Sequence, residues 1–157
     1  IGNLVGRGSD TEVLINSWKA KLAMIQSESD NSAIKPKVFF QEWDEPIISS
    51  IHWVSELISI AGGIDCFENK RNGVLARDRY VSKQDVADAN PDIIIGSWCG
   101  KPVDFNWVRN QEEWKSTQAI VNNRIFEIGS SLILQPGPAL FLEGIDKLRE
   151  CILSFKS

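Results

Sequence analysis

Several features that mark other classes of protein are missing from this sequence. No apolar run approaches the ~20 residues that a membrane-spanning helix needs, and no segment of about 20 to 50 residues repeats. Lys and Arg do not cluster on one stretch, and 17 basic residues stand against 21 acidic ones, for a net charge of −4. These absences exclude a repeat architecture and argue against nucleic acid as a partner, because such binding needs a basic patch.

Cysteine and histidine are also scarce. The cysteines are odd in number and widely spaced: Cys66, Cys99 and Cys151. The sequence therefore carries neither a disulfide framework nor a CxxC metal or redox motif. His52 is the sole histidine, and the apolar pattern of IISSIHWVSEL around it predicts a helix rather than a loop.

The chain does have enough apolar residues for one folded domain. Of its 157 residues, 43% are hydrophobic, which supports a core and excludes disorder. Apolar residues at helical spacing predict a long amphipathic helix over residues 10–29. Ser9 or Asp10 is the expected N-cap of this helix, and a polar SESDNS segment closes it.

Strands and helices alternate along the rest of the chain. Strands are predicted where short apolar runs occur, at residues 37–41, 92–97 and 124–128. Helices are predicted at residues 47–61, 82–90, part of 103–114, and 139–155. This order predicts an α/β fold: a three-layer lobe with a mostly parallel central sheet flanked by helices, preceded by a long helix.

The apolar run at residues 92–97 leads without a spacer into the tetrapeptide WCGK. Ligands of open parallel sheets bind beyond the carboxyl ends of the strands, where the loops gather. An exposed Trp98 at such an edge suits a large flat ligand, and Gly96 and Gly100 permit the tight turns around it. The equal alternative is that Trp98 packs as core, with Cys99 as a small buried hydrophobe and Lys101 as a solvated charge.

Four motifs occur in the order EWDEP, NPDIII, SWCGK and LQPGP. Together they resemble the C-terminal lobe of periplasmic substrate-binding proteins of cobalamin and iron-siderophore ABC transporters. In that family one long helix joins two α/β lobes, and the ligand lies in the cleft between them. The resemblance implies that residues 1–30 are the end of an N-terminal lobe and the connecting helix, and residues 31–157 the C-terminal lobe.

The resemblance also implies a function. The protein would be no enzyme and have no resident cofactor or metal. It would bind a large organometallic molecule, a cobalamin-like corrinoid or a ferric siderophore, and deliver it to an ABC transporter permease. Its partners would be that permease and the missing N-terminal lobe, and its location periplasmic or otherwise extracytoplasmic, with a lipid anchor as an option.

The family's functional positions transfer to this sequence motif by motif. The cleft positions fall on Glu42, Trp43 and Asp44, on Arg77 and Tyr80, on Ser97, Trp98, Cys99 and Lys101, and on Leu134 and Gln135. The acidic position that contacts the permease in the family falls on Gln84, with Asp85 beside it. This departure from the family pattern leaves Asp85 as the candidate docking acid.

Two alternatives stay open at this point. A ligand-sensing or scaffold domain of the same fold would keep the lobe and lose transport, which Gln84 in place of an acid permits. A thiol- or metal-dependent enzyme would pair Cys99 with His52, or bind a metal through Glu42, Asp44 and Cys99, without the dense ligand spacing of typical sites. The plain interpretation of EWDEP is a polar loop whose acids favour the start of the next helix.

Overall fold

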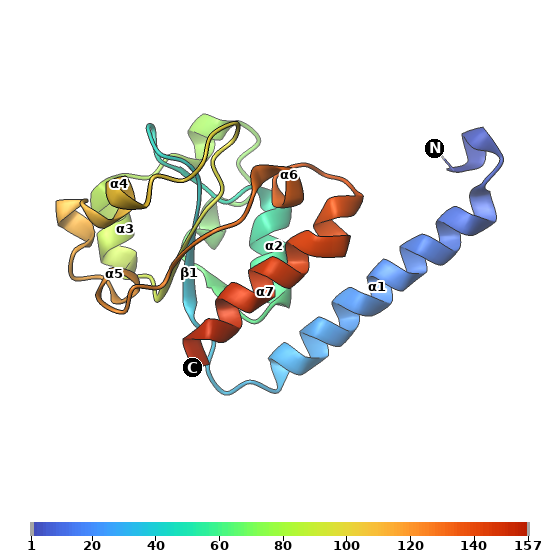
Figure 1. Ribbon diagram of the computed structural model, residues 1–157, viewed down its shortest axis with the longest axis horizontal. Coiled ribbons are helices and arrows are strands. Elements are labelled where there is room, and N and C mark those ends of the chain that lie inside the picture. The colour runs from blue at the N-terminus through green and yellow to red at the C-terminus, as the bar shows by residue number, and fades with distance from the viewer. Residues whose placement is uncertain (1, 157) are drawn as a thin grey trace.

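The computed structural model describes residues 2–156, in which a long helix leads into an α/β lobe (Figure 1). The strands are β1 (Lys37–Trp43), β2 (Ile48–Ser49), β3 (Ile64–Asp65), β4 (Ile93–Gly96) and β5 (Ile125–Glu127). The α-helices are α1 (Gly8–Asp30), α2 (His52–Ile60), α3 (Lys83–Ala89), α4 (Phe105–Arg109), α5 (Gln118–Val121), α6 (Ser130–Ile133) and α7 (Ile145–Leu153). Short 3-10 turns are η1 (Gly2–Val5), η2 (Glu68–Lys70), η3 (Ala76–Arg79), η4 (Glu112–Trp114) and η6 (Ser154–Lys156), and η5 (Leu140–Gly144) is a π-helical turn.

The five strands form one sheet in the order β2-β1-β4-β5, with β3 also paired to β1. β3, β1, β4 and β5 run parallel, and β2 alone is antiparallel. In the register of the three longer strands, Gln41 lies opposite Gly96, and Gly96 lies opposite Glu127. The predicted α/β class with a mostly parallel sheet is confirmed.

Strand residues alternate between two separate hydrophobic cores, one on each face of the sheet. Val38 and Phe40 point into an aliphatic core formed with α2 and α7, and Phe39 points into the opposite core beneath α3, α4 and α5. Phe39 there meets Trp114 edge to face, with ring centroids 5.8 Å apart. Both faces of the sheet are thus covered by helices (Figure 1), which explains the unbroken apolar sequence of β4.

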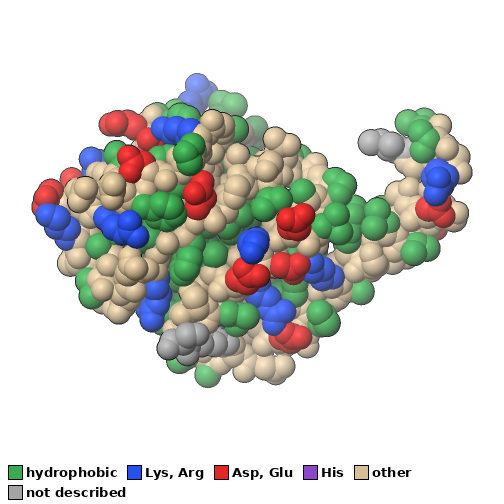
Figure 2. Space-filling view, in the orientation of Figure 1, with side chains coloured by type: hydrophobic (Ala, Val, Ile, Leu, Met, Phe, Trp, Pro, Cys, Tyr) green, Lys and Arg blue, Asp and Glu red, His purple; other side chains and the backbone are tan. Residues whose placement is uncertain are grey.

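The long helix α1 lies mostly outside the lobe. Of its 23 residues only Ile25 is buried, although the predicted amphipathic stripe began several turns earlier. Trp18 stacks on Phe141 at 4.9 Å between centroids, and Lys21 pairs with Asp146 at 2.7 Å, so these contacts with the lobe begin near the middle of the helix. Figure 2 shows hydrophobic side chains on the half that protrudes.

The predicted N-cap of α1 is wrong. The helix starts at Gly8 after Arg7, and no side chain caps it. Ser9 and Asp10 lie inside the first turn, where Asp10 pairs with the Arg7 side chain and offers its charge to the positive end of the helix. At α3, in contrast, a side chain does cap the helix: the Ser82 hydroxyl accepts a hydrogen bond from the Asp85 amide at 3.0 Å.

Two boundaries near the first strand differ from those predicted. β1 continues through Glu42 and Trp43, because pairing with β2 extends it. The helix predicted over residues 47–61 begins only at His52, since Ile48 and Ser49 form β2. Ile47 therefore packs into the core on the opposite face from α2.

The predicted C-terminal helix over residues 139–155 is divided. The π-helical turn η5 precedes α7, and Gly144 lies at their junction. A Cβ at Gly144 would lie 2.4 Å from the carbonyl oxygen of Leu132, so only glycine allows α6 to pack this closely on the junction.

Candidate ligand-binding site

Three loops that carry predicted site residues follow the carboxyl ends of β1, β4 and β5. The end of β4 is fixed against β1, because the Ser97 amide donates to the carbonyl of Gln41 at 2.8 Å. The Ile128 amide donates in turn to the carbonyl of Gly96 at 3.0 Å. Parallel pairing thus brings the segments after residues 43, 96 and 127 to one edge of the sheet.

Trp43, Asp44, Trp98 and Lys101 form the central cluster of this edge, hereafter the Lys101 cluster. The Lys101 ammonium donates to Asp44 Oδ1 at 2.9 Å and to Asp44 Oδ2 at 2.8 Å. It also lies 4.3 Å from the ring centroid of Trp43 and 4.9 Å from that of Trp98. One cation is therefore held between two indole faces and a carboxylate.

Trp98 is not the exposed indole that the sequence suggested. Its exposed fraction is 3%, and it packs edge to face against Trp107 with centroids 5.8 Å apart. The alternative of a core position holds, because residues after the tetrapeptide fold back over the indole. The Lys101 ammonium lies over the face of this ring, 4.9 Å from its centroid.

Glu42 and Arg79 form a second, buried ion pair at this edge. The guanidinium donates to Glu42 Oε2 at 2.7 Å and to the Ser49 carbonyl at 2.7 Å, while Glu42 also accepts from the amide of Ile51. Burial raises the pKa of the Glu42 carboxyl, and the hydrogen bond and charge of Arg79 lower it in part. Arg79 was not among the residues predicted from the sequence, since an arginine in a polar loop is usually solvated.

Arg79 determines where the predicted loop residues Arg77 and Tyr80 lie. Ser49 Oγ donates to the Arg79 carbonyl at 3.0 Å, so side chain and backbone of this residue both fasten η3 to β2. Arg77 and Tyr80 on either side are exposed. The buried pair therefore presents two exposed side chains beside the strand ends.

Comparison with known proteins identifies the family of this chain. Residues 1–132 match the family described as periplasmic binding protein. The chain belongs to that family. Among curated proteins none matches the sequence.

Solved structures of periplasmic binding proteins share the fold at low sequence identity. A possible iron-binding solute-binding protein of Staphylococcus epidermidis matches with a TM-score of 0.79 and 22% identity, over 96% of this chain and 58% of its own. The heme-binding protein RhuT of Roseiflexus matches with a TM-score of 0.78 and 17% identity, over 99% and 60%. The vitamin B12 binding protein BtuF of Vibrio cholerae matches with a TM-score of 0.64 and 18% identity, over 88% and 52%. This periplasmic binding protein chain thus spans about three fifths of the first two structures.

The remaining predicted cleft residues of this periplasmic binding protein differ in accessibility. Ser97 is buried, and its hydroxyl has no hydrogen-bond partner within residues 2–156. Cys99 is a free, exposed thiol. Leu134 is half-buried and Gln135 is exposed, directly after α6. Apart from Ser97 and Trp98, these side chains can be reached from solvent.

Gln84 and Asp85, the predicted docking residues, lie exposed in the first turn of α3. Gln84 donates to Asp88 Oδ1 at 2.7 Å. The Asp85 carboxylate accepts from the Ser82 amide at 2.7 Å, and hydrogen bonds from the Ser82 backbone and hydroxyl lower its pKa. A negative charge is therefore present on this surface, but one of its oxygens is engaged in the helix cap.

The side chains of the alternative thiol or metal site make other contacts in the structure. His52 faces Glu56, with Nε2 3.3 Å from Oε1, in the first turns of α2. Glu42 and Asp44 are each paired with a cation. Across residues 2–156 no group of three His, Cys, Asp or Glu side chains is placed to hold a metal ion.

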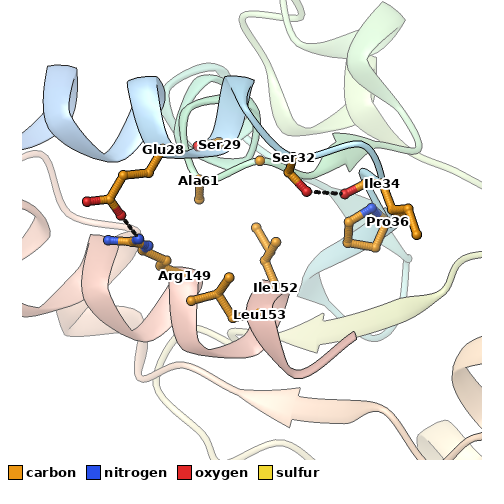
Figure 3. A pocket seen from close by; sticks show the side chains of 10 residues that line it. Glu28, Ser29, Ser32, Ile34, Pro36, Ala61, Arg149, Ile152 and Leu153 are labelled. Carbon is orange, nitrogen blue, oxygen red and sulfur yellow. Dashed lines mark hydrogen bonds and ion pairs between the residues drawn. The ribbon is translucent and has the colours of Figure 1, made fainter. Parts of the chain in front are cut away.

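Two hollows that border α1 lie away from the Lys101 cluster. A cavity of about 200 Å³ lies near Pro36, at the amino end of β1, where Glu28 and Arg149 pair across its mouth (Figure 3). An apolar hollow of about 450 Å³ lies between α1, α2 and η5, with Trp18, Trp53 and Phe141 in its wall. Neither contains a predicted site residue.

None of the described helices is both long and apolar enough to cross a bilayer.

Proposed function

We propose that this chain is the C-terminal lobe of the substrate-binding component of an ABC importer. It binds a cobalamin-like corrinoid or a ferric siderophore in a cleft between two lobes and delivers it to a permease. Residues 1–30 form the end of the other lobe and the connecting helix, and residues 31–157 form the ligand-binding lobe. The observation that carries this proposal is the Lys101 cluster at the carboxyl edge of a parallel sheet.

The chemistry of that edge supports a large ligand that is apolar in part. The indole of Trp43 offers a half-buried aromatic face, and Tyr80 and Leu134 add accessible apolar surface nearby along the loops. Asp44, Lys101 and Arg77 provide charged groups for a polar periphery. Such a mixture of a few polar groups on an apolar lining is typical of sites for bulky small molecules.

The family and its structural neighbours support the same class of ligand. The neighbours' own descriptions name iron, heme and vitamin B12, that is, a metal and two metal-centred molecules. A binding protein of this family works without catalysis, and outside the cytoplasmic membrane, where a lipid anchor would keep it near its permease. We infer that Asp85, with Gln84 beside it, provides the docking contact to permease cations.

Tryptophan fluorescence tests the proposal. A chain that carries both lobes is titrated with cobalamin, cobinamide, haem and a ferric siderophore. We expect saturable quenching by one of them. In Trp43→Ala this binding should be lost or weakened at least about tenfold, because Trp43 is the more accessible of the two indoles in the Lys101 cluster. Trp18→Phe, a tryptophan on α1 stacked against Phe141, is the matched control and keeps the binding constant.

Absence of quenching by all four ligands would overturn the proposal. So would equal loss of affinity in Trp43→Ala and Trp18→Phe, because the binding site would then lie elsewhere.

A further inference from the structure

We propose that Trp43, Trp98 and Asp44 form an ammonium cage, occupied in the free protein by the chain's own Lys101. In the complex, a cationic arm of the imported molecule displaces Lys101 from this cage. The inference rests on the proposed function and narrows it to a metal chelate that carries a primary ammonium or a similar alkyl cation.

The cage already holds the chemical group that it is proposed to bind. The Lys101 ammonium contacts two ring faces, at 4.3 Å and 4.9 Å from their centroids, and both oxygens of Asp44 at 2.8–2.9 Å. Ring faces attract cations through the aromatic quadrupole, and a carboxylate supplies charge and hydrogen-bond acceptors. The three walls thus match the recognition chemistry of an alkylammonium ion.

The walls are fixed more firmly than the occupant. Trp98 is buried against Trp107, and Trp43 donates its indole N–H to the Glu45 carbonyl at 3.0 Å. The Asp44 side chain is only 17% exposed, whereas that of Lys101 is 41% exposed. The two indoles therefore have contacts that do not depend on the lysine, whereas the carboxylate is freed for another cation when the lysine leaves.

The backbone around Lys101 is suited to such a departure. Gly100 has φ +79°, and a Cβ built on it meets no atom within 4 Å, so the turn lies in open space. Both hydrogen bonds of the Lys101 ammonium go to Asp44. Lysine has four rotatable side-chain bonds, so it can turn out of the cage without any change in the strands.

The charge of the emptied cage selects a cation over an anion. Once Lys101 has turned away, Asp44 and two electron-rich ring faces remain. Glu45 lies exposed in the adjoining turn. An anionic group that entered in place of the lysine would face the Asp44 carboxylate at short range, which is unfavourable.

Chemical rescue tests the cage itself. Lys101→Ala removes the occupant, and n-butylammonium has the same four carbons and ammonium group as a complete lysine side chain. We expect saturable changes in tryptophan fluorescence on titrating Lys101→Ala with n-butylammonium, and at least about tenfold weaker binding by the native chain, whose tethered ammonium competes. The neutral analogue 1-butanol and sodium chloride at equal ionic strength serve as matched controls, and we expect no saturable change with either.

A second variant makes this test decisive. In Lys101→Ala/Asp44→Asn, we expect n-butylammonium binding to weaken at least about tenfold, while circular dichroism shows an unchanged fold. The cage is overturned if n-butylammonium does not bind Lys101→Ala, or if 1-butanol binds equally well.

A matched pair of chelates tests the cage in its proposed role. Ferrioxamine B is a ferric trihydroxamate that ends in a primary ammonium, and N-acetylation removes only that charge. We expect a chain with both lobes to bind the free amine at least about tenfold more tightly, and Asp44→Asn to abolish the difference. Tighter binding of the acetylated form, or no difference, overturns the inference.

The importer proposal and the ammonium cage can be refuted independently of each other. If a chain with both lobes binds a corrinoid but ignores the ammonium arm, the importer proposal stands and the cage is wrong. If it binds no metal chelate while Lys101→Ala still binds n-butylammonium, the importer proposal and the role of the cage in it are both overturned, and a cation site remains.

Discussion

Glu42 and Asp44 lie two positions apart at the end of β1, and each is paired with a basic side chain in a different environment. The side chains of Glu42 and Arg79 are 12% and 5% exposed, and those of Asp44 and Lys101 are 17% and 41% exposed. Breaking a buried pair leaves a charge without solvent, whereas an exposed pair is worth little because water replaces the partner. Burial thus makes the first pair part of the architecture and leaves the second free to exchange partners.

The largest effect is expected on removing the buried cation. Arg79→Met should lower the free energy of unfolding by about 3–5 kcal/mol, because Glu42 then remains as a buried unpaired charge. Urea denaturation measures the loss. Arg77→Met, two residues away and exposed, is the matched control and should change stability by less than about 0.5 kcal/mol.

The double variant Glu42→Gln/Arg79→Met sharpens this result. It should recover part of the stability, since neither charge is left alone. Equal losses in Arg79→Met and Arg77→Met would refute the contrast between the two pairs.

Cysteine labelling compares the reactivity of the exposed thiol of Cys99 with that of the half-buried thiol of Cys66. Cys99, two residues before Lys101, is exposed, whereas burial raises the pKa of the Cys66 thiol to about 12. At pH 8 only about one Cys66 in 10,000 is then a thiolate, the form that reacts. We expect Cys99 to react with iodoacetamide at least about 100-fold faster, as followed by mass spectrometry of the native protein.

Cys99→Ser is the control, and it should abolish the fast phase. Similar labelling rates at the two sites would show that the Cys66 thiol is not protected by its surroundings.

The pH dependence of stability tests how burial acts on Glu42. Because burial raises its pKa, the folded protein holds this proton more tightly than the unfolded chain does. The stabilising contribution of this group is therefore complete below its unfolded pKa of about 4.3. It is lost as the pH rises through the folded pKa.

The measurement is urea denaturation over a series of pH values. We expect the stability of the native chain relative to Glu42→Gln to fall from about pH 4 upward. A relative stability that rises with pH would show that Arg79 outweighs burial.

The smallest effect is expected at the exposed pair. Lys101→Ala should lower the free energy of unfolding by about 1 kcal/mol or less, because the ion pair is solvated and cation–π contacts are weak at accessible sites. A double-mutant cycle with Asp44→Asn in urea denaturation gives the coupling energy directly. A loss as large as that of Arg79→Met would make Lys101 structural and end the contrast.

Much of the fold could be predicted from local sequence. Ile93, Ile94 and Ile95 are fully buried, as a continuous apolar run between polar segments indicates. The helix predicted from Ser82 onward is present as α3, with Ser82 as its N-cap. In contrast, β2 and β3 have two residues each, too few for any periodicity, and they depend on pairing with β1.

The candidate site could be predicted less completely, because its geometry depends on residues distant in sequence. Because loops that follow parallel strands gather at one edge of the sheet, the sequence correctly predicts that Asp44 and Lys101 lie at the same edge. The burial of Trp98 depends on Trp107, which folds back after the loop. The role of Arg79 depends on Glu42, a partner in another element, and no local pattern marks an arginine that will be buried.

The contacts of α1 with the lobe also determine how the helix is rotated about its own axis. Trp18, Lys21 and Glu28 meet Phe141, Asp146 and Arg149. Spacings of three and seven residues place the three helix residues on one face, so α1 cannot turn about its own axis without losing all of these contacts. A helix of this length extends over about 35 Å. These contacts therefore fix the rotation of α1 about its own axis relative to the lobe that carries the Lys101 cluster, and they set the direction in which its free amino-terminal turns project.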